Sequence, residues 1–223
     1  EVVERGSAEG VILIPGGLGE RRGSEGLADR VRAAVTAGRR RGDGPVVTGA
    51  NSMGIRSVPG RYDATFIPAY KASTAAEVPA VPLAFLSQSG AFAIARLDRF
   101  RHLRPRYLVT LGNQLDLTVG DYLTFWQDDP EVAVFACYLE GFRPGDGTRF
   151  LDAAARIRAR GGLVLLYLGG RTPAGAAAVS SHTASLAPEH RMATALAAAA
   201  GVLVAETLDD FEDLLRVAVA LHD

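Results

Sequence analysis

The sequence predicts an α/β protein built on a doubly wound parallel sheet. After residue 78, five short apolar runs rich in β-branched and aromatic residues alternate with five segments of helical periodicity. This alternation is typical of a five-stranded parallel sheet of flavodoxin-like type, with helices on both faces. The expected strands are 83–86, 107–111, 132–138, 163–168 and 202–205, and the expected helices are 91–100, 119–127, 148–160, 189–200 and 209–221.

The residues before 78 predict a smaller unit. A strand at 11–14, a helix at 27–37 and a strand at 45–48 are expected there. The stretch 57–79 contains three prolines and little apolar periodicity, which indicates a connection between two units. We therefore expect a division into 1–77 and 78–223. Two strands and one helix bury too little apolar surface for an independent core. The first unit is therefore interpreted as the second half of a Rossmann-type domain whose front half is missing.

Composition excludes several classes of function. The 223 residues carry 24 basic and 25 acidic side chains, so no overall charge points to nucleic acid or to an anionic membrane. No apolar run approaches the ~20 residues that span a bilayer, and the charged start does not resemble a signal peptide. The single cysteine, Cys137, excludes a disulfide framework, and four scattered histidines show no metal-ligand spacing. We expect a cytoplasmic protein without a bound metal.

Polar loops follow four of the expected strands. They are 87–90 (Ser-Gln-Ser-Gly), 112–116 (Gly-Asn-Gln-Leu-Asp), Glu140-Gly141 and the loop around His182. Because the carboxyl ends of parallel strands meet at one edge of a sheet, these loops are expected to lie close together. The sequence therefore predicts a binding or catalytic site at that edge.

The residue types in these loops suit phosphoryl transfer. The start of a helix at 87–90 offers hydroxyls and backbone N–H groups to an anion, although Ser-x-Ser-Gly also simply caps helices. A carboxylate such as Glu140 can accept the N–H of one imidazole nitrogen and leave the other free to attack; its alternative partners are Arg171 and water. His182 is flanked by hydroxyls, and a loop histidine bonded among small polar residues is the alternative. Together the three parts predict a phosphohistidine.

A further polar loop follows the strand at 45–48. In it Asn51 lies between two glycines and is a candidate ligand contact, with an ordinary turn asparagine as the alternative.

The chain resembles the NDP-forming acyl-CoA synthetases, the family of ADP-forming acetate–CoA ligase and succinyl-CoA synthetase. The resemblance runs in order over nearly the whole chain, which makes it more specific than any single motif. The motifs that carry it are Gly-Ala-Asn-Ser-Met-Gly at 49–54, Leu-Ser-Gln-Ser-Gly-Ala at 86–91, Leu-Gly-Asn at 111–113 with Asp116, Tyr-Leu-Glu-Gly at 138–141, Gly-Arg-Thr at 170–172 and Ser-His-Thr-Ala-Ser-Leu at 181–186.

The resemblance implies a reaction in which acyl-CoA and phosphate give an acyl phosphate, whose phosphoryl group passes to a histidine and then to ADP, or the reverse. His182 matches the phosphorylated histidine and Glu140 the glutamate that hydrogen-bonds it. Two further sets of residues are implied, a phosphate-binding set (Ser87, Ser89, Gly90, Ser181 and Thr183) and a set on the CoA or acyl side (Asn51, Ser52, Gly112 and Asn113).

The resemblance also implies which substrates and partners are needed. CoA and ADP or ATP with Mg²⁺ are substrates; the nucleotide and Mg²⁺ belong to an ATP-grasp domain or β subunit that this sequence lacks, and no flavin is expected. Acyl-CoA and phosphate are the small partners, and a homo-oligomer is compatible with the sequence. The family's first CoA-binding strand and glycine loop are missing. The sequence also differs from the residue usual in the family at five positions, which are Ala50, Ser52, Leu168, Ala184 and Pro188.

Two other functions are compatible with parts of the sequence. One is a catalytically silent, ligase-like module that senses acyl-CoA in a protein acetyltransferase. Retention of both His182 and Glu140 argues against it, because a silent copy needs neither. The other, a flavin-binding flavodoxin, rests on fold analogy alone.

Overall fold

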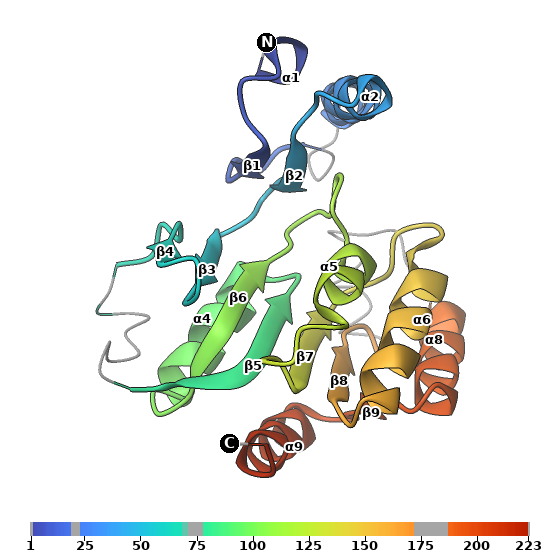
Figure 1. Ribbon diagram of the computed structural model, residues 1–223. Coiled ribbons are helices and arrows are strands. Elements are labelled where there is room, and N and C mark those ends of the chain that lie inside the picture. Colours follow the sequence, from blue (N-terminus) through green and yellow to red (C-terminus); the bar gives the residue numbers. More distant parts are fainter. Residues whose placement is uncertain (1, 19–22, 69, 71–77, 172–186, 223) are drawn as a thin grey trace.

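The structure is a computed structural model and describes residues 2–18, 23–68, 70, 78–171 and 187–222. These residues form a seven-stranded sheet and a separate two-stranded sheet (Figure 1). The strands are β1 (Gly10–Leu13), β2 (Val46–Gly49), β3 (Ile55–Ser57), β4 (Tyr62–Asp63), β5 (Ala80–Ser87), β6 (Arg104–Thr110), β7 (Val134–Leu139), β8 (Leu163–Leu168) and β9 (Leu203–Val204). The helices are α1 (Val2–Arg5), α2 (Glu25–Arg41), α4 (Gly90–Arg99), α5 (Val119–Trp126), α6 (Asp146–Ala159), α8 (Ala187–Ala199) and α9 (Leu208–Ala220).

The five strands from β5 to β9 form the parallel sheet that the sequence predicts. They lie in the order β6-β5-β7-β8-β9, and each neighbouring pair is parallel. Numbered along the chain, this is the 2-1-3-4-5 order of flavodoxin-like folds. The predicted fold class is therefore confirmed.

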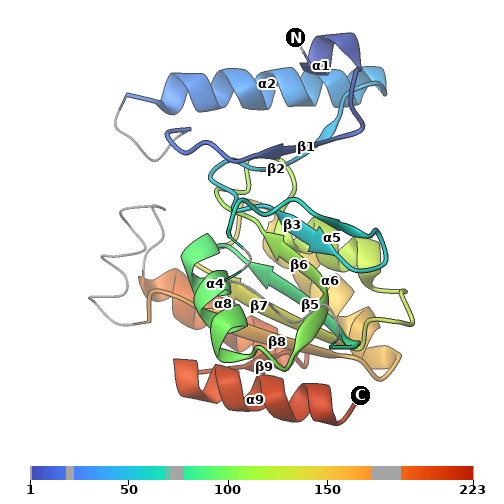
Figure 2. The same cartoon turned by 90° about the vertical axis from the view of Figure 1, so that its left-hand side faces the viewer.

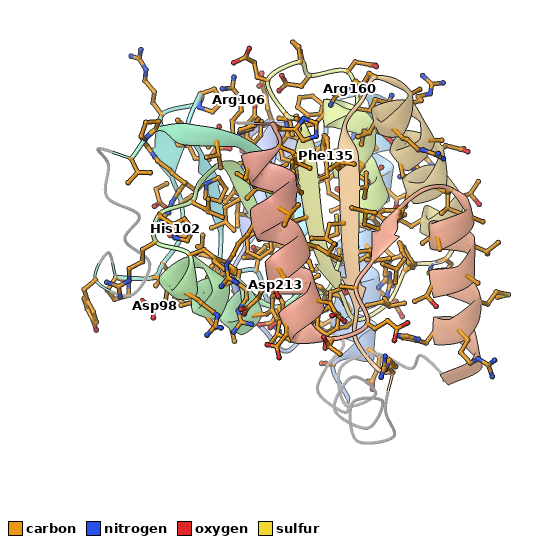
Figure 3. All side chains as sticks on the ribbon, turned by 90° about the horizontal axis from the view of Figure 1, so that it is seen from below. Asp98, His102, Arg106, Phe135, Arg160 and Asp213 are labelled. Carbon is orange, nitrogen blue, oxygen red and sulfur yellow. The ribbon has the colours of Figure 1, made fainter. Side chains whose placement is uncertain are left out.

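Helices cover both faces of this sheet (Figures 1 and 2). One apolar core lies under α5, α6 and α8, and a second lies under α4 and α9. Strand β7 serves both: Phe135, labelled in Figure 3, and Cys137 point into the first core, whereas Val134 and Ala136 point into the second. Burial on both faces explains why the strand sequences are continuous apolar runs and not alternating ones.

Two further strands extend the sheet, which corrects the prediction for 57–79. Strand β3 pairs antiparallel with β6, with Ile55 opposite Val109, and β4 pairs antiparallel with β3. Part of the expected connection is therefore an edge hairpin. It escaped prediction because both residues of β4 are exposed, so the strand has no apolar alternation to detect. The division of the chain at residue 78 stays a prediction.

The small sheet has the predicted strand–helix–strand order. Strands β1 and β2 are parallel, with Gly10 opposite Val46, and α2 connects them. The helix ends at Arg41 and is capped by Gly42, whose φ of 80° is left-handed, and three arginines fill its last turn. Among the residues that the structure places, none of the helices combines the length and apolarity that a bilayer span requires.

A buried glutamate joins the two helices that cover one face of the sheet. Glu212 on α9 has a side chain only 4% exposed, and Arg96 on α4 donates to it at 2.6 Å. Arg99 and Arg216 also pair with this carboxylate. Because removing one member of a buried pair leaves the other charge unpaired, Glu212→Ala should lower the free energy of unfolding by about 3–5 kcal/mol, measured by urea denaturation.

The adjacent residue provides a matched control for this prediction. Asp213, labelled in Figure 3, has a side chain 74% exposed and pairs with Arg216 one turn along the same helix. Asp213→Ala should change the free energy of unfolding by only about 0–1 kcal/mol, as for other exposed pairs. Similar losses in the two variants would contradict the structural role assigned to Glu212.

Candidate functional site

A cavity of about 790 Å³ lies between the carboxyl edge of the large sheet and the small unit of β1, β2 and α2. In a 2-1-3-4-5 sheet the chain leaves β5 toward one side and returns to β7 on the other, so the loops after these two strands diverge and leave a crevice. Loops after β2, β5, β6 and β7 all reach the cavity wall. Three of the four polar loops that were expected to converge therefore reach one cavity, and the fourth, around His182, lies outside the described residues.

The loop after β5 brings the start of a helix to the cavity. Ser89 is the N-cap of α4, where its Oγ accepts the Phe92 N–H at 3.3 Å, and Ser89 and Gly90 line the cavity. The amino end of α4 therefore contributes its partial positive charge there. Ser87 differs: its side chain is fully buried, and its Oγ donates to the Ser89 carbonyl at 2.6 Å. Ser87 thus stabilises the turn through this buried hydrogen bond and does not line the cavity.

Glu140 follows β7 and lines the same cavity. Its backbone N–H donates to Gln88 Oε1 at 2.9 Å, which ties the loop after β7 to the loop after β5. Burial, and then the negative charge of Glu140, raise the pKa of the Tyr138 phenol. The phenol therefore remains protonated beside the carboxylate. Tyr138 in turn stacks on Phe92 of α4 at 3.9 Å between ring centroids.

Two buried amides fix the orientation of these loops. Gln114, 2% exposed, accepts the Val119 N–H through Oε1 at 3.1 Å, so its Nε2 must point the other way. That nitrogen donates to Gln88 Oε1 at 3.3 Å and to the Gly141 carbonyl at 3.4 Å. Gln88 Oε1 thus receives two donors, and Gln88 itself lines the cavity. The Gln88 amide therefore lies in the loop that leads into α4.

The residues predicted for the CoA or acyl side form the junction with the small unit. The Asn113 N–H donates to the Ala50 carbonyl at 2.8 Å, and a Cβ at Gly112, whose φ is +58°, would clash with that carbonyl. Ser52 is buried and donates through Oγ to the Thr110 carbonyl at 2.6 Å. All four predicted residues line the cavity, the fourth being Asn51.

Three predicted residues, Ser181, His182 and Thr183, lie outside the described residues. Arg171, the alternative partner for Glu140, pairs with Glu206 at 3.0 Å. Within the described ranges no group of three metal-ligating side chains occurs.

The residues that sequence reasoning missed are Gln88, Gln114 and Tyr138. Gln88 and Gln114 lie inside the polar loops 87–90 and 112–116, but the contact between them joins residues 26 positions apart, which local sequence does not reveal. Only Tyr138 has a local signal in the sequence. It lies two positions before Glu140 at the end of an expected strand, and residues two apart on a strand face the same side.

Residues 80–218 match the family described as succinyl-CoA ligase like flavodoxin domain. Curated relatives include the acetate–CoA ligase [ADP-forming] I subunit alpha of Pyrococcus furiosus, 32% identical over 97% of this chain and 45% of that protein. Another is a trans-feruloyl-CoA synthase of an unknown prokaryote, 29% identical over 98% of this chain and 30% of that protein. The chain spans less than half the length of these relatives.

A solved structure gives the same assignment. The chain is similar to the dinucleotide forming acetyl-coenzyme A synthetase 1 of Ca. Korarchaeum cryptofilum, determined in complex with phosphate and ADP. The TM-score is 0.80 and the identity 30%, over 98% of this chain and 45% of that one. The chain therefore belongs to the NDP-forming acyl-CoA synthetases and carries their succinyl-CoA ligase like flavodoxin domain.

Proposed function

We propose that this chain is the part of an NDP-forming acid–CoA ligase that carries a phosphoryl group from an acyl phosphate to a nucleotide, through a phosphohistidine at His182. One observation carries the proposal: Glu140, Gln88 and the amino end of α4 line a single cavity at the point where the strand order reverses. A carboxylate beside a helix start and an amide donor is the arrangement that a transferred phosphoryl group and its acceptor imidazole require.

The first step forms the acyl phosphate. An oxygen of inorganic phosphate attacks the thioester carbon of the acyl-CoA, the C–S bond breaks, and CoA leaves as a thiolate that takes up a proton. Backbone N–H groups at Ser89 and Gly90, together with Gln88 Nε2, hold the phosphate oxygens. Asn51, Ser52, Gly112 and Asn113 line the CoA or acyl side of the cavity.

The second step moves the phosphoryl group to the protein. A nitrogen of His182 attacks phosphorus, an N–P bond forms, and the P–O bond to the acyl group breaks, so that the acid leaves as a carboxylate. The other imidazole nitrogen keeps its proton and donates it in a hydrogen bond to Glu140, whose charge balances that of the ring. Ser181 and Thr183 contribute hydroxyl donors to the phosphoryl oxygens.

The third step needs a partner. A terminal oxygen of ADP attacks the phosphohistidine, which gives ATP and restores the imidazole; the reverse direction uses the same groups. An ATP-grasp domain or β subunit supplies the nucleotide and Mg²⁺ site. The carrier role is then the specific contribution of this chain.

The proposal is tested with the full-length protein, its ATP-grasp partner, Mg²⁺ and ATP labelled at the γ-phosphate. We expect label on the protein that is labile in acid and stable in base, approaching one phosphate per site. If the ATP-grasp partner binds ATP but the protein stays unlabelled, the proposal is wrong. That result would favour the silent acyl-CoA-sensing module.

A further inference from the structure

The segment 112–117, which follows β6, attaches the small unit to the large sheet. Three alternate backbone N–H groups of this segment donate to carbonyls at the end of β2 and just beyond it. The N–H groups of Asn113, Leu115 and Leu117 donate to the carbonyls of Ala50, Gly49 and Val47 at 2.8, 2.6 and 3.0 Å. The Asn113 side chain also donates to the Leu18 carbonyl, in the loop after β1, at 3.3 Å. One short segment therefore bonds both strands' loops of the small unit.

Asp116 adds a carboxylate to this attachment. Its side chain is only 10% exposed, and its Oδ2 accepts the Val47 N–H at 2.8 Å and Arg39 Nη2 at 3.0 Å. Val47 lies on β2 and Arg39 lies in the last turn of α2, so one oxygen joins the strand and the helix of the small unit. Hydrogen bonds to an ionised acceptor are stronger than those between neutral groups, so this carboxylate strengthens the attachment more than a further backbone bond would.

The other wall of the cavity is fixed to the same segment through Gln114. The buried amide of Gln114 bonds Gln88 and the Gly141 carbonyl, and Gln88 Oε1 accepts the Glu140 N–H. The attachments at 114 and 116 are two residues apart, at most about 7 Å along the chain. The segment 112–117 therefore sets the distance between the small unit and Glu140.

Asp116 itself does not line the cavity, whereas Asn113 and Leu115 of the same segment do. Its effect on a ligand must therefore pass through the wall that it holds. That wall carries Asn51, which directly follows the Ala50 carbonyl bonded by the segment. Without the carboxylate, fewer molecules have both walls placed to contact a ligand at once, and the apparent affinity falls in proportion to that fraction.

We propose that Asp116 is a positioning residue for CoA binding, which holds the small unit against the segment 112–117 so that both walls of the cavity contact CoA. The inference rests on the proposed function, which puts CoA in this cavity. It adds a residue that touches neither CoA nor phosphate. Transfer of the phosphoryl group from ATP to His182 uses Glu140, the amino end of α4 and the partner, so it does not depend on Asp116.

The test measures two quantities in the full-length protein. They are the affinity for CoA, by titration calorimetry, and the rate of labelling by ATP with the ATP-grasp partner and Mg²⁺. Asp116→Ala removes the acceptor of both Val47 and Arg39. It should weaken CoA binding roughly 10-fold, the lower end of the range for hydrogen bonds to charged groups, and leave the rate of labelling unchanged.

A second variant answers the same question with less change to the fold. Asp116→Asn keeps the size of the side chain and an acceptor oxygen, but it removes the charge that faces Arg39. Because a charge-assisted hydrogen bond is about twice as strong as a neutral one, this variant should lose about half of the free-energy effect and bind CoA roughly 3-fold more weakly. Labelling should again be unchanged.

Asp43→Ala is the matched control. Asp43 is 52% exposed and pairs with Arg41 at 3.1 Å, so the variant breaks an ion pair at the same end of α2 but none of the bonds to the segment 112–117. Both measured quantities should equal those of the wild type.

The outcomes separate this inference from the proposed function. Wild-type CoA affinity in both Asp116 variants would overturn the positioning role alone. Parallel losses of CoA affinity and labelling would also overturn it, in favour of a general structural role. If the wild type binds CoA but takes no label, the carrier function is wrong, and the CoA affinities of the variants still decide the role of Asp116. A wild type that does not bind CoA would overturn both.

Discussion

Replacing His182 with alanine is expected to abolish labelling of the protein by ATP and, with it, phosphoryl exchange between acyl-CoA and nucleotide. The loss should be on the order of 10⁴-fold or more, because the side chain that forms the N–P bond is removed outright. Glu140 and Gln88 can hold or orient a phosphoryl group, but neither replaces an imidazole nitrogen as its carrier. The measurement is acid-labile phosphate bound per protein chain.

The same variant tests the order of the steps. Acyl phosphate forms before the histidine acts in the proposed sequence, so His182→Ala should still make it from acyl-CoA and phosphate, detectable as a hydroxamate after trapping with hydroxylamine. His102→Ala is the control: His102, labelled in Figure 3, is exposed and precedes β6 at the opposite edge of the sheet. Its label should equal that of the wild type. Normal labelling of His182→Ala would exclude His182 as the carrier.

The strands that the sequence predicts well are those buried on both faces. Strand β8 is Leu163–Leu168 in both the prediction and the structure, because an unbroken apolar run lies between Gly162 and Gly169. Strand β5 was predicted four residues too short. Pro82 interrupts its apolar run, and the pairing of β5 with β6 shifts register between Val81 and Ala84, so the start of the strand carries no regular pattern.

The sequence predicts where the candidate site lies, but not how its side chains are oriented. Loops that follow parallel strands lie at one edge of the sheet, and Ser89, Gly90 and Glu140 line one cavity at that edge. The direction of a side chain within a loop has no such rule, which is why Ser87 turns inward to bond the Ser89 carbonyl. Whether a residue of α2 such as Arg32 reaches the cavity depends on how that helix packs against the rest of the fold, and helix periodicity gives no information about that.

Glu140→Gln is expected to slow phosphorylation of His182 by roughly 10²- to 10⁴-fold, the range for partners in proton and charge transfer. The amide has nearly the same size, and the backbone N–H at this position keeps its hydrogen bond to Gln88 Oε1, so the loop is not released. A neutral amide oxygen can still accept the imidazole N–H, but it cannot balance the positive charge that the ring gains as its other nitrogen bonds to phosphorus. Rapid-quench measurement of label against time gives the rate.

The matched control removes a glutamate at the other end of the same strand. Glu131 precedes β7, is exposed, and pairs with Arg106 at 3.5 Å. Glu131→Gln should therefore label at the wild-type rate. Unfolding midpoints should be alike in the two variants, since the change at Glu140 removes charge and not packing. If Glu140→Gln instead labels as fast as Glu131→Gln, the carboxylate has no part in the transfer, and the imidazole must be oriented by another group.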